Sequence, residues 1–327
     1  MAVLAPLSFR FWRHTGALLA VVTQLLVVSC ATITAPDSAT RLRQTAGLIE
    51  DVKTFGKSLG IEPTAALTRT VREGPALSML WLWMQREGTL ALNGPMDIRT
   101  AIGYWAESER VKVERIYRVD GYSVYYRQGD EFADSRSVAT PGFAEERLAL
   151  LVKVVLHEDL HGDNNFALPW EIEEALVTPL GSLAAAEYFR QKGDERNLRS
   201  ALTSLADERQ AAKELNALVA RAQVILAQEK IDVAKEKVLA FLGEYPAYQK
   251  QFERQVRGQH APTVLEAKLS HDLAYYRYFD SIVTLAELAP SLKALIADLR
   301  SIPAEATHAI ADAHLRGLRS NYIAASH

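Results

Sequence analysis

The chain has 327 residues, of which 49% are hydrophobic and 24% are charged, values that suit a folded protein and exclude wholesale disorder. Its formal net charge of −3 argues against a nucleic-acid partner, because proteins that bind nucleic acids are normally basic. A single cysteine excludes a disulfide framework and any zinc site built from cysteines.

The first 29 residues are predicted to be a signal peptide. A positively charged start precedes an apolar stretch over residues 17–28, which is too short for a permanent membrane span. The stretch ends in Val27-Val28-Ser29-Cys30, which resembles a bacterial lipobox. The only cysteine of the chain therefore stands where a lipid would be attached, and residues 30–40 are expected to form a tether.

The interpretation of Cys30 as a lipid-attachment site also predicts where the protein is located. The next residue is Ala31 and not aspartate, which among lipoproteins favours the outer membrane. We therefore expect a protein of the bacterial cell envelope, held in the outer membrane by lipid on Cys30 and facing the periplasm. The alternative is a plain signal peptide and an incidental cysteine.

From Arg41 onward the hydrophobic pattern is mostly helical. Apolar residues recur at helical spacing over residues 42–55. An aromatic-rich segment over residues 77–84 is expected to be buried, with Trp81 and Trp83 in the core rather than in a ligand site. The start of the folded part is thus predicted to be helical, followed by a buried segment.

A small β part and a helical remainder complete the predicted organisation. Residues 111–126 carry β-branched and aromatic residues around the turn dipeptide Asp120-Gly121, which predicts a hairpin or two strands of a small sheet. Residues 129–142 are expected to form a loop, and residues 143–161 a long helix with an apolar middle. Residues 195–300 predict three or four packed helices.

The helix over residues 143–161 ends in an HExxH sequence, His157-Glu158-Asp159-Leu160-His161. Histidines four residues apart project from one helical face, so both imidazoles can bind one metal ion. The glutamate between them is placed to accept a proton from a metal-bound water. His157 and His161 are therefore predicted metal ligands and Glu158 the general base; the alternative is a pair of surface histidines.

A zinc site needs a third protein ligand, and the segment that follows offers three glutamates. Residues 162–169 break the first helix, and a second helix that starts near Trp170 is expected to run back antiparallel. Glu174 lies deeper in this helix, ahead of an apolar run, and is the predicted third ligand. Glu171 stands at the mouth of the site, and Glu173 points about 100° away from the helix face that carries Glu171 and Glu174. These two glutamates are therefore expected to compensate the helix dipole.

One stretch resembles the metal segment of a family of bacterial lipoproteins predicted to be zinc aminopeptidases. It reads Val154-Val155-Leu156-His157-Glu158-x-x-His161, followed after twelve residues by Glu174-x-x-x-Thr178. Two shorter segments, Gly121-Tyr122-Ser123-Val124-Tyr125 and Glu266-Ala267-Lys268-Leu269, are similar to further motifs of that family.

The resemblance implies a fold that is mainly α (α+β), with a helical gluzincin-like metallopeptidase core. A small β-hairpin or sheet would precede the HExxH helix, and a C-terminal helical bundle would cover about residues 195–327 of a domain that spans residues 41–327. The resemblance also implies Zn²⁺ as the cofactor, bound by His157, His161 and Glu174, and a peptide as the substrate.

Three further roles stay open in the sequence. The donor that stabilises an oxyanion could be one of several aromatic residues: Tyr122, Tyr125, Tyr126, His271, Tyr275 or Tyr278. Glu131 or Asp134 could hold the α-amine of an aminopeptidase substrate, and Thr178 could hold a ligand imidazole.

The predicted function is a membrane-anchored zinc peptidase, aminopeptidase-like, that hydrolyses peptide bonds with a zinc-activated water. The main alternative is a non-catalytic envelope lipoprotein whose helical body binds a partner and whose metal site is vestigial. A periplasmic metal-buffering protein fits poorly, because the sequence has no His-rich or Met-rich tract.

Overall fold

The computed structural model describes residues 38–73, 79–101, 110–129, 133, 135–161 and 165–325. The chain divides into two units, Met1–Thr40 and Arg41–His327. The predicted signal peptide, Cys30 and most of the predicted tether lie outside the described residues. No helix within the described ranges combines the length and the apolar character needed to cross a membrane.

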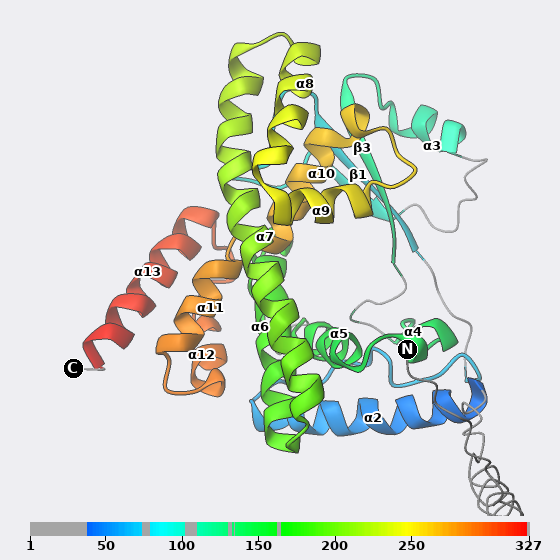
Figure 1. The fold of residues 1–327 in the computed structure, drawn as a ribbon, viewed down its shortest axis with the longest axis vertical. Coiled ribbons are helices and arrows are strands. Elements are labelled where there is room, and N and C mark those ends of the chain that lie inside the picture. Colours follow the sequence, from blue (N-terminus) through cyan, green and yellow to red (C-terminus); the bar gives the residue numbers. More distant parts are fainter. Residues whose placement is uncertain are drawn as a thin grey trace, which may run out of the picture. The chain divides into compact units, whose positions relative to one another are not determined.

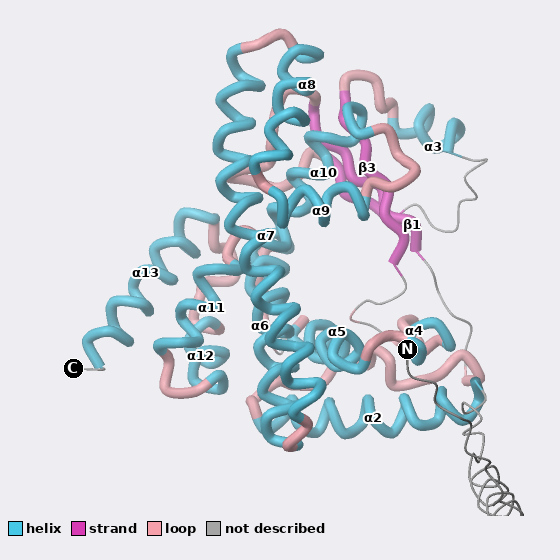
Figure 2. The backbone as a smooth tube through the Cα atoms, in the orientation of Figure 1, coloured by secondary structure: helices cyan, strands magenta, loops and turns pink. Residues whose placement is uncertain are grey.

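A three-stranded antiparallel sheet has the order β2-β1-β3, with strands β1 (Met79–Arg86), β2 (Ile98–Ala101) and β3 (Tyr122–Gly129). Figure 2 draws the strands in magenta. In the central strand, Trp83 pairs with Arg99 on one side and Tyr125 on the other. Because side chains alternate along a strand, Trp83, Tyr125 and Arg127 share one face. That face packs against helix α10 (Ala261–Tyr276).

The predicted hairpin over residues 111–126 is wrong in its first half. Arg110–Tyr117 forms a helix, α3, and only Tyr122–Gly129 forms a strand. Val113, Ile116 and Tyr117 also fit helical spacing, so an alternating pattern over so few residues does not separate the two structures. The partner of β3 is β1, the aromatic-rich segment that was expected to be buried.

The predicted helix over residues 143–161 is divided into α4 (Pro141–Glu145) and α5 (Leu148–Leu160). Thr140 caps α4, since its side-chain oxygen accepts a hydrogen bond from a backbone N–H of the first turn at 3.0 Å. Glu146 takes an extended conformation, with ψ at 158°, and ends α4. A new helix then begins, and most of α5 is buried, as its apolar run predicts.

The other helices pack beside α5, beside the sheet or against one another (Figure 1). They are α2 (Ser38–Ser58), α6 (Trp170–Lys192), α7 (Glu195–Gln228), α8 (Ile231–Phe241), α9 (Pro246–Gln255), α11 (Phe279–Leu288), α12 (Leu292–Leu299) and α13 (His308–Ala325). Residues 195–300 thus contain six helices, α7 to α12, where three or four were predicted. The class is α+β and mainly helical, as predicted.

Two large hydrophobic clusters hold these elements together. The first joins α2, α5, most of α6 and α11 to α13, and the second joins the Trp83 face of the sheet to α7 through α10. Trp170, the first residue of α6, packs against the second cluster, whereas Ile172 belongs to the first. The start of α6 therefore lies where the two clusters meet, and the predicted site residues lie around it.

Candidate metal centre

Two histidines meet at the end of α5. His157 lies in the last turn of the helix, which ends at Leu160, and His161 is the first residue beyond it. Their Nε2 atoms are 3.3 Å apart, and the ring planes are nearly perpendicular, at 85°. Solvent reaches both imidazoles, because the side chains of His157 and His161 keep 15% and 12% of their accessible surface.

Helix α6 brings a carboxylate to the same point. Glu174 Oε2 lies 3.5 Å from Nε2 of His157 and 3.5 Å from Nε2 of His161. This oxygen is buried and has no hydrogen-bond partner among the described residues. A buried carboxylate oxygen without a donor is costly unless a cation compensates its charge. The three predicted ligands are thus brought together around a point where a cation could lie.

The triangle formed by these three atoms fits a tetrahedral zinc ion. Zinc binds histidine nitrogen and carboxylate oxygen at about 2.0–2.2 Å, so two ligand atoms of a tetrahedral ion lie about 3.3–3.5 Å apart. The observed separations are 3.3, 3.5 and 3.5 Å. Three protein ligands leave a fourth position for water, which is the arrangement of catalytic zinc sites.

The charges around this triangle also favour a bound cation. Burial opposes ionisation of Glu174, but the positive charges of His161 and His157 outweigh it and hold the pKa of Glu174 well below its usual range. Burial likewise opposes a charged His161, yet Glu174 and Glu173 raise the pKa of His161 well above its usual value. A proton on His161 or a metal ion within the triangle would each supply positive charge beside the Glu174 carboxylate.

Glu173 does not face away from the site, and the expectation that it only compensates the helix dipole is wrong. Its Oε1 lies 2.6 Å from Nδ1 of His161, the ring nitrogen on the side opposite the triangle. Neighbouring carboxylates on α6 can therefore reach the two nitrogens of a single imidazole, because His161 lies beyond the helix end. A carboxylate on the second nitrogen orients a ligand histidine and raises its basicity.

Glu173→Ala is therefore expected to weaken zinc affinity by about 10- to 100-fold, because it frees the ring of His161. Competition with a chromophoric zinc chelator measures the change. Glu171→Ala is the matched control, since that glutamate has no contact with either imidazole among the contacts of the described residues. Equal zinc affinity in the two variants would contradict a positioning role for Glu173.

Two further residues of α6 shape the site and were missed in the sequence. The indole N–H of Trp170 donates to Oε1 of Glu174 at 3.0 Å, which leaves Oε2 for the triangle. A Cβ on Gly181 would lie 3.1 Å from Cβ of His157 and 3.3 Å from the carbonyl oxygen of Lys153. A larger residue at this position would require α5 and α6 to move apart by a few tenths of an ångström, so Gly181 favours the close approach across which Glu174 meets the histidines.

The predicted base and a predicted positioning residue lie beside the triangle. Glu158 is buried in α5, and burial raises its pKa against the opposing charges of His157 and His161. A raised pKa suits a carboxylate that accepts and returns a proton. The hydroxyl of Thr178 is buried without a hydrogen-bond partner among the described residues, so Glu173 contacts a ligand imidazole where Thr178 was expected to.

One of the predicted oxyanion donors, Tyr275, is linked to the triangle through Trp170. The ring of Tyr275 packs edge-on against Trp170 with ring centres 5.8 Å apart, and the ring centre of His271, another predicted donor, lies 5.0 Å from that of Tyr275 on a tilted ring. Burial raises the pKa of Tyr275, and the negative charges of Glu174 and Glu158 add to this effect. Its hydroxyl therefore stays protonated and can donate a hydrogen bond.

The remaining predicted residues lie elsewhere. Tyr122 and Tyr126 pack on the opposite face of the sheet, and Tyr125 is buried in the core. Tyr278 is hydrogen-bonded to His308 at 3.0 Å. Glu131 and Asp134, the predicted acids for a substrate amine, lie outside the described residues.

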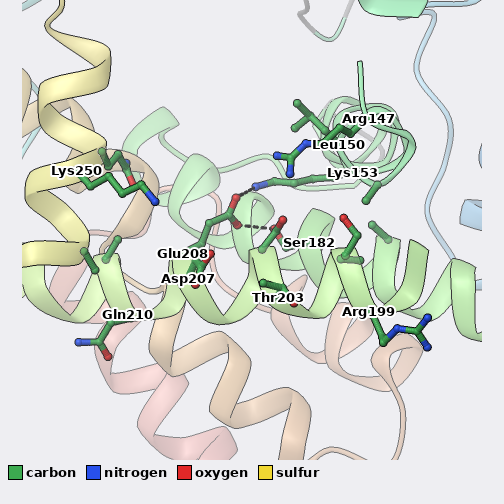
Figure 3. Close-up of a pocket in the computed structure, with 18 of the residues that line it drawn as sticks. Arg147, Leu150, Lys153, Ser182, Arg199, Thr203, Asp207, Glu208, Gln210 and Lys250 are labelled. Atoms are coloured by element: carbon green, nitrogen blue, oxygen red, sulfur yellow. Dashed lines mark hydrogen bonds and ion pairs between the residues drawn. The ribbon is translucent and has the colours of Figure 1, made fainter. Parts of the chain in front are cut away.

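A cleft of about 820 Å³ reaches Lys153, one helical turn before His157 on α5 (Figure 3). It also reaches Ser182, the neighbour of Gly181 on α6. Glu208 of α7 accepts hydrogen bonds from Lys153 and Ser182 and so links the three helices in the cleft.

Comparisons with protein-family models, with curated proteins and with solved structures found no match to this chain. The class of the site is therefore defined by its geometry. An HExxH segment and a following helix bring two histidines and a glutamate together, an arrangement compatible with a glutamate-type zinc site.

Proposed function

We propose that the protein is a zinc-dependent hydrolase that cleaves peptide bonds. The main support is the triangle of His157, His161 and Glu174 with Glu158 beside it. A structural zinc site normally has four protein ligands, whereas three ligands and an adjacent carboxylate are typical of hydrolases. Zinc held there would lower the pKa of a bound water and polarise a substrate carbonyl.

The residues of the chain carry the proton transfers in this proposal. Glu158 accepts a proton from the attacking water and returns it to the leaving nitrogen. The hydroxyl of Tyr275 is the donor for the charge that develops on the carbonyl oxygen. Trp170 holds Glu174 in place through its indole N–H. An aminopeptidase preference is supported by the sequence resemblance alone.

Zinc content and peptide cleavage together test this function. Elemental analysis of the purified protein is expected to give one zinc per chain, and His157→Ala and Glu174→Ala are expected to lose it. A peptide library, analysed by mass spectrometry, should be cleaved by the wild type and by the Glu171→Ala control, and spared by the two ligand variants. Stoichiometric zinc in a His157→Ala/His161→Ala double variant would overturn the proposal, and a zinc-loaded wild type that cleaves nothing would favour a non-catalytic lipoprotein.

We also propose that the protein is lipid-anchored in the bacterial outer membrane through Cys30, facing the periplasm. The lipobox-like Val27-Val28-Ser29-Cys30 supports this. Cys30→Ser is expected to shift the protein from the membrane fraction to an unprocessed or soluble form, because it removes the acylated thiol. Membrane partitioning of the variant equal to that of wild type, after salt and carbonate washes, would contradict the anchor.

A further inference from the structure

Arg127 on β3 lies next to the aromatic residues that border the triangle. Its guanidinium carbon is 5.4 Å from the ring centre of Tyr275, and its Nη1 lies 3.4 Å from Nε2 of His271. Tyr275 packs against Trp170, whose indole donates to Glu174. A chain of direct contacts therefore joins the guanidinium to a predicted metal ligand.

His271 and Asp272 form a buried hydrogen-bonded pair, and His271 contacts Arg127 directly. His271 Nδ1 donates to Oδ1 of Asp272 at 2.9 Å, which leaves Nε2 as an acceptor for Arg127. Burial lowers the pKa of His271 to about 4, so the imidazole stays neutral and keeps that acceptor. Tyr248 donates to the other oxygen of Asp272 at 2.7 Å and fixes the carboxylate in turn.

The guanidinium of Arg127 is nevertheless available to a ligand. The side chain is exposed, and it has no carboxylate within ion-pair distance in the described ranges of the chain. Arg99 lies close by, with its guanidinium carbon 3.9 Å from the ring centre of Trp170, and it too forms no ion pair there. Two arginines thus flank the pair formed by Trp170 and Tyr275. Guanidinium groups held in a fixed direction are suited to bind carboxylates.

We propose that Arg127 binds a carboxylate of the peptide substrate beside the metal-ligand triangle, with Arg99 adding positive charge. This inference rests on the proposed peptidase function. The carboxylate could be the free C-terminus of the peptide or the side chain of a glutamate or aspartate. Either source gives a preference unlike that of an aminopeptidase, in which an acidic residue would bind the substrate amine.

Three series of alanine hexapeptides separate these sources. The first has an amidated C-terminus, the second a free C-terminus, and the third is amidated and carries one glutamate moved through each position. We expect kcat/KM to be about 10- to 100-fold higher for one of the two carboxylate series than for the neutral series. Arg127→Gln should remove this preference. Arg86→Gln should keep it, because Arg86 lies 5.6 Å from the ring centre of Tyr122 on the other face of the sheet.

Binding provides a second measurement that does not require turnover. Calorimetric titration of the same peptides into Glu158→Gln, with and without Arg127→Gln, should show the same preference and the same loss. Carboxylate-dependent binding that requires Arg127, without cleavage by the wild type, would support this inference and contradict the peptidase function. Cleavage and binding that do not distinguish the three series, or a preference that survives Arg127→Gln, would overturn the inference and leave the peptidase function standing.

Discussion

Glu158→Gln is expected to reduce kcat for peptide hydrolysis by about 10²- to 10⁴-fold, the contribution typical of a positioned general base. Glutamine has the same shape as glutamate but cannot accept a proton from water. Glu158 is not part of the triangle of potential ligands, so the variant should keep one zinc per chain. Steady-state kinetics and elemental analysis of the same preparation measure both quantities.

The matched control for this variant is Glu171→Gln, which makes the same chemical change in the first turn of α6. It is expected to change kcat by less than about twofold, because Glu171 contacts neither imidazole among the described residues. A Glu158→Gln variant with more than about a tenth of wild-type turnover would show that another group accepts the proton. Loss of zinc from that variant would show that Glu158 contributes to the metal site directly.

The triangle of potential metal ligands could be predicted because its parts are local in sequence. His157 and His161 are four residues apart, and helical geometry alone brings such residues together. Glu174 lies on the next helix, after a single short connection, and two helices joined in this way most simply pack antiparallel. The structure places it 3.5 Å from both imidazoles. The division of the predicted helix into α4 and α5 did not disturb this, because it occurs ten residues before His157.

The surroundings of the triangle could not be predicted, because they depend on side-chain directions and on contacts distant in sequence. The contact of Glu173 with His161 requires that His161 lie beyond the end of α5. Asp159, inside the HExxH segment, is buried and accepts hydrogen bonds from Lys53 and Thr64 of a segment far earlier in the chain. No pattern around residue 159 reveals such a partner.

Contacts distant in sequence also explain why the predicted hairpin over residues 111–126 was wrong. β3 pairs with β1 and not with the segment directly before it. Pairing between distant strands is set by the packing of the whole face, here Trp83 and Tyr125 against α10. The alternating pattern correctly identified residues 122–126 as extended, within a strand that runs to Gly129, but it carried no information about the partner strand.

A second large effect is expected on stability, from a buried ion pair within α10. Lys268 and Asp272 are one turn apart, and their side chains are 0% and 1% exposed. Lys268 donates to Asp272 and also to Gln255 at 2.6 Å. Tyr248 and His271 donate to the two carboxylate oxygens of Asp272, so every charge in this network is met by a partner.

Asp272→Ala is expected to lower the free energy of unfolding by about 3–5 kcal/mol, because it leaves the Lys268 ammonium buried without its counter-charge. Urea titration followed by circular dichroism measures the loss. The double variant Lys268→Met/Asp272→Leu is the control and should recover much of it, since it removes both charges together. A cost below about 1 kcal/mol for Asp272→Ala would show that water reaches the ammonium and that the network is not sealed.

The pH dependence of stability gives an independent check on the same carboxylate. Burial raises the pKa of Asp272, but Lys268 and His271 outweigh it and lower this pKa to about 2. Because the pKa is lower in the folded state than in the unfolded chain, the stability that Asp272 contributes is fully present above about pH 4. It is lost as the pH falls toward 2. The wild type should therefore lose stability over this range more steeply than Asp272→Asn, which has no proton to gain, and parallel curves would show that the carboxylate is not ion-paired in the folded protein.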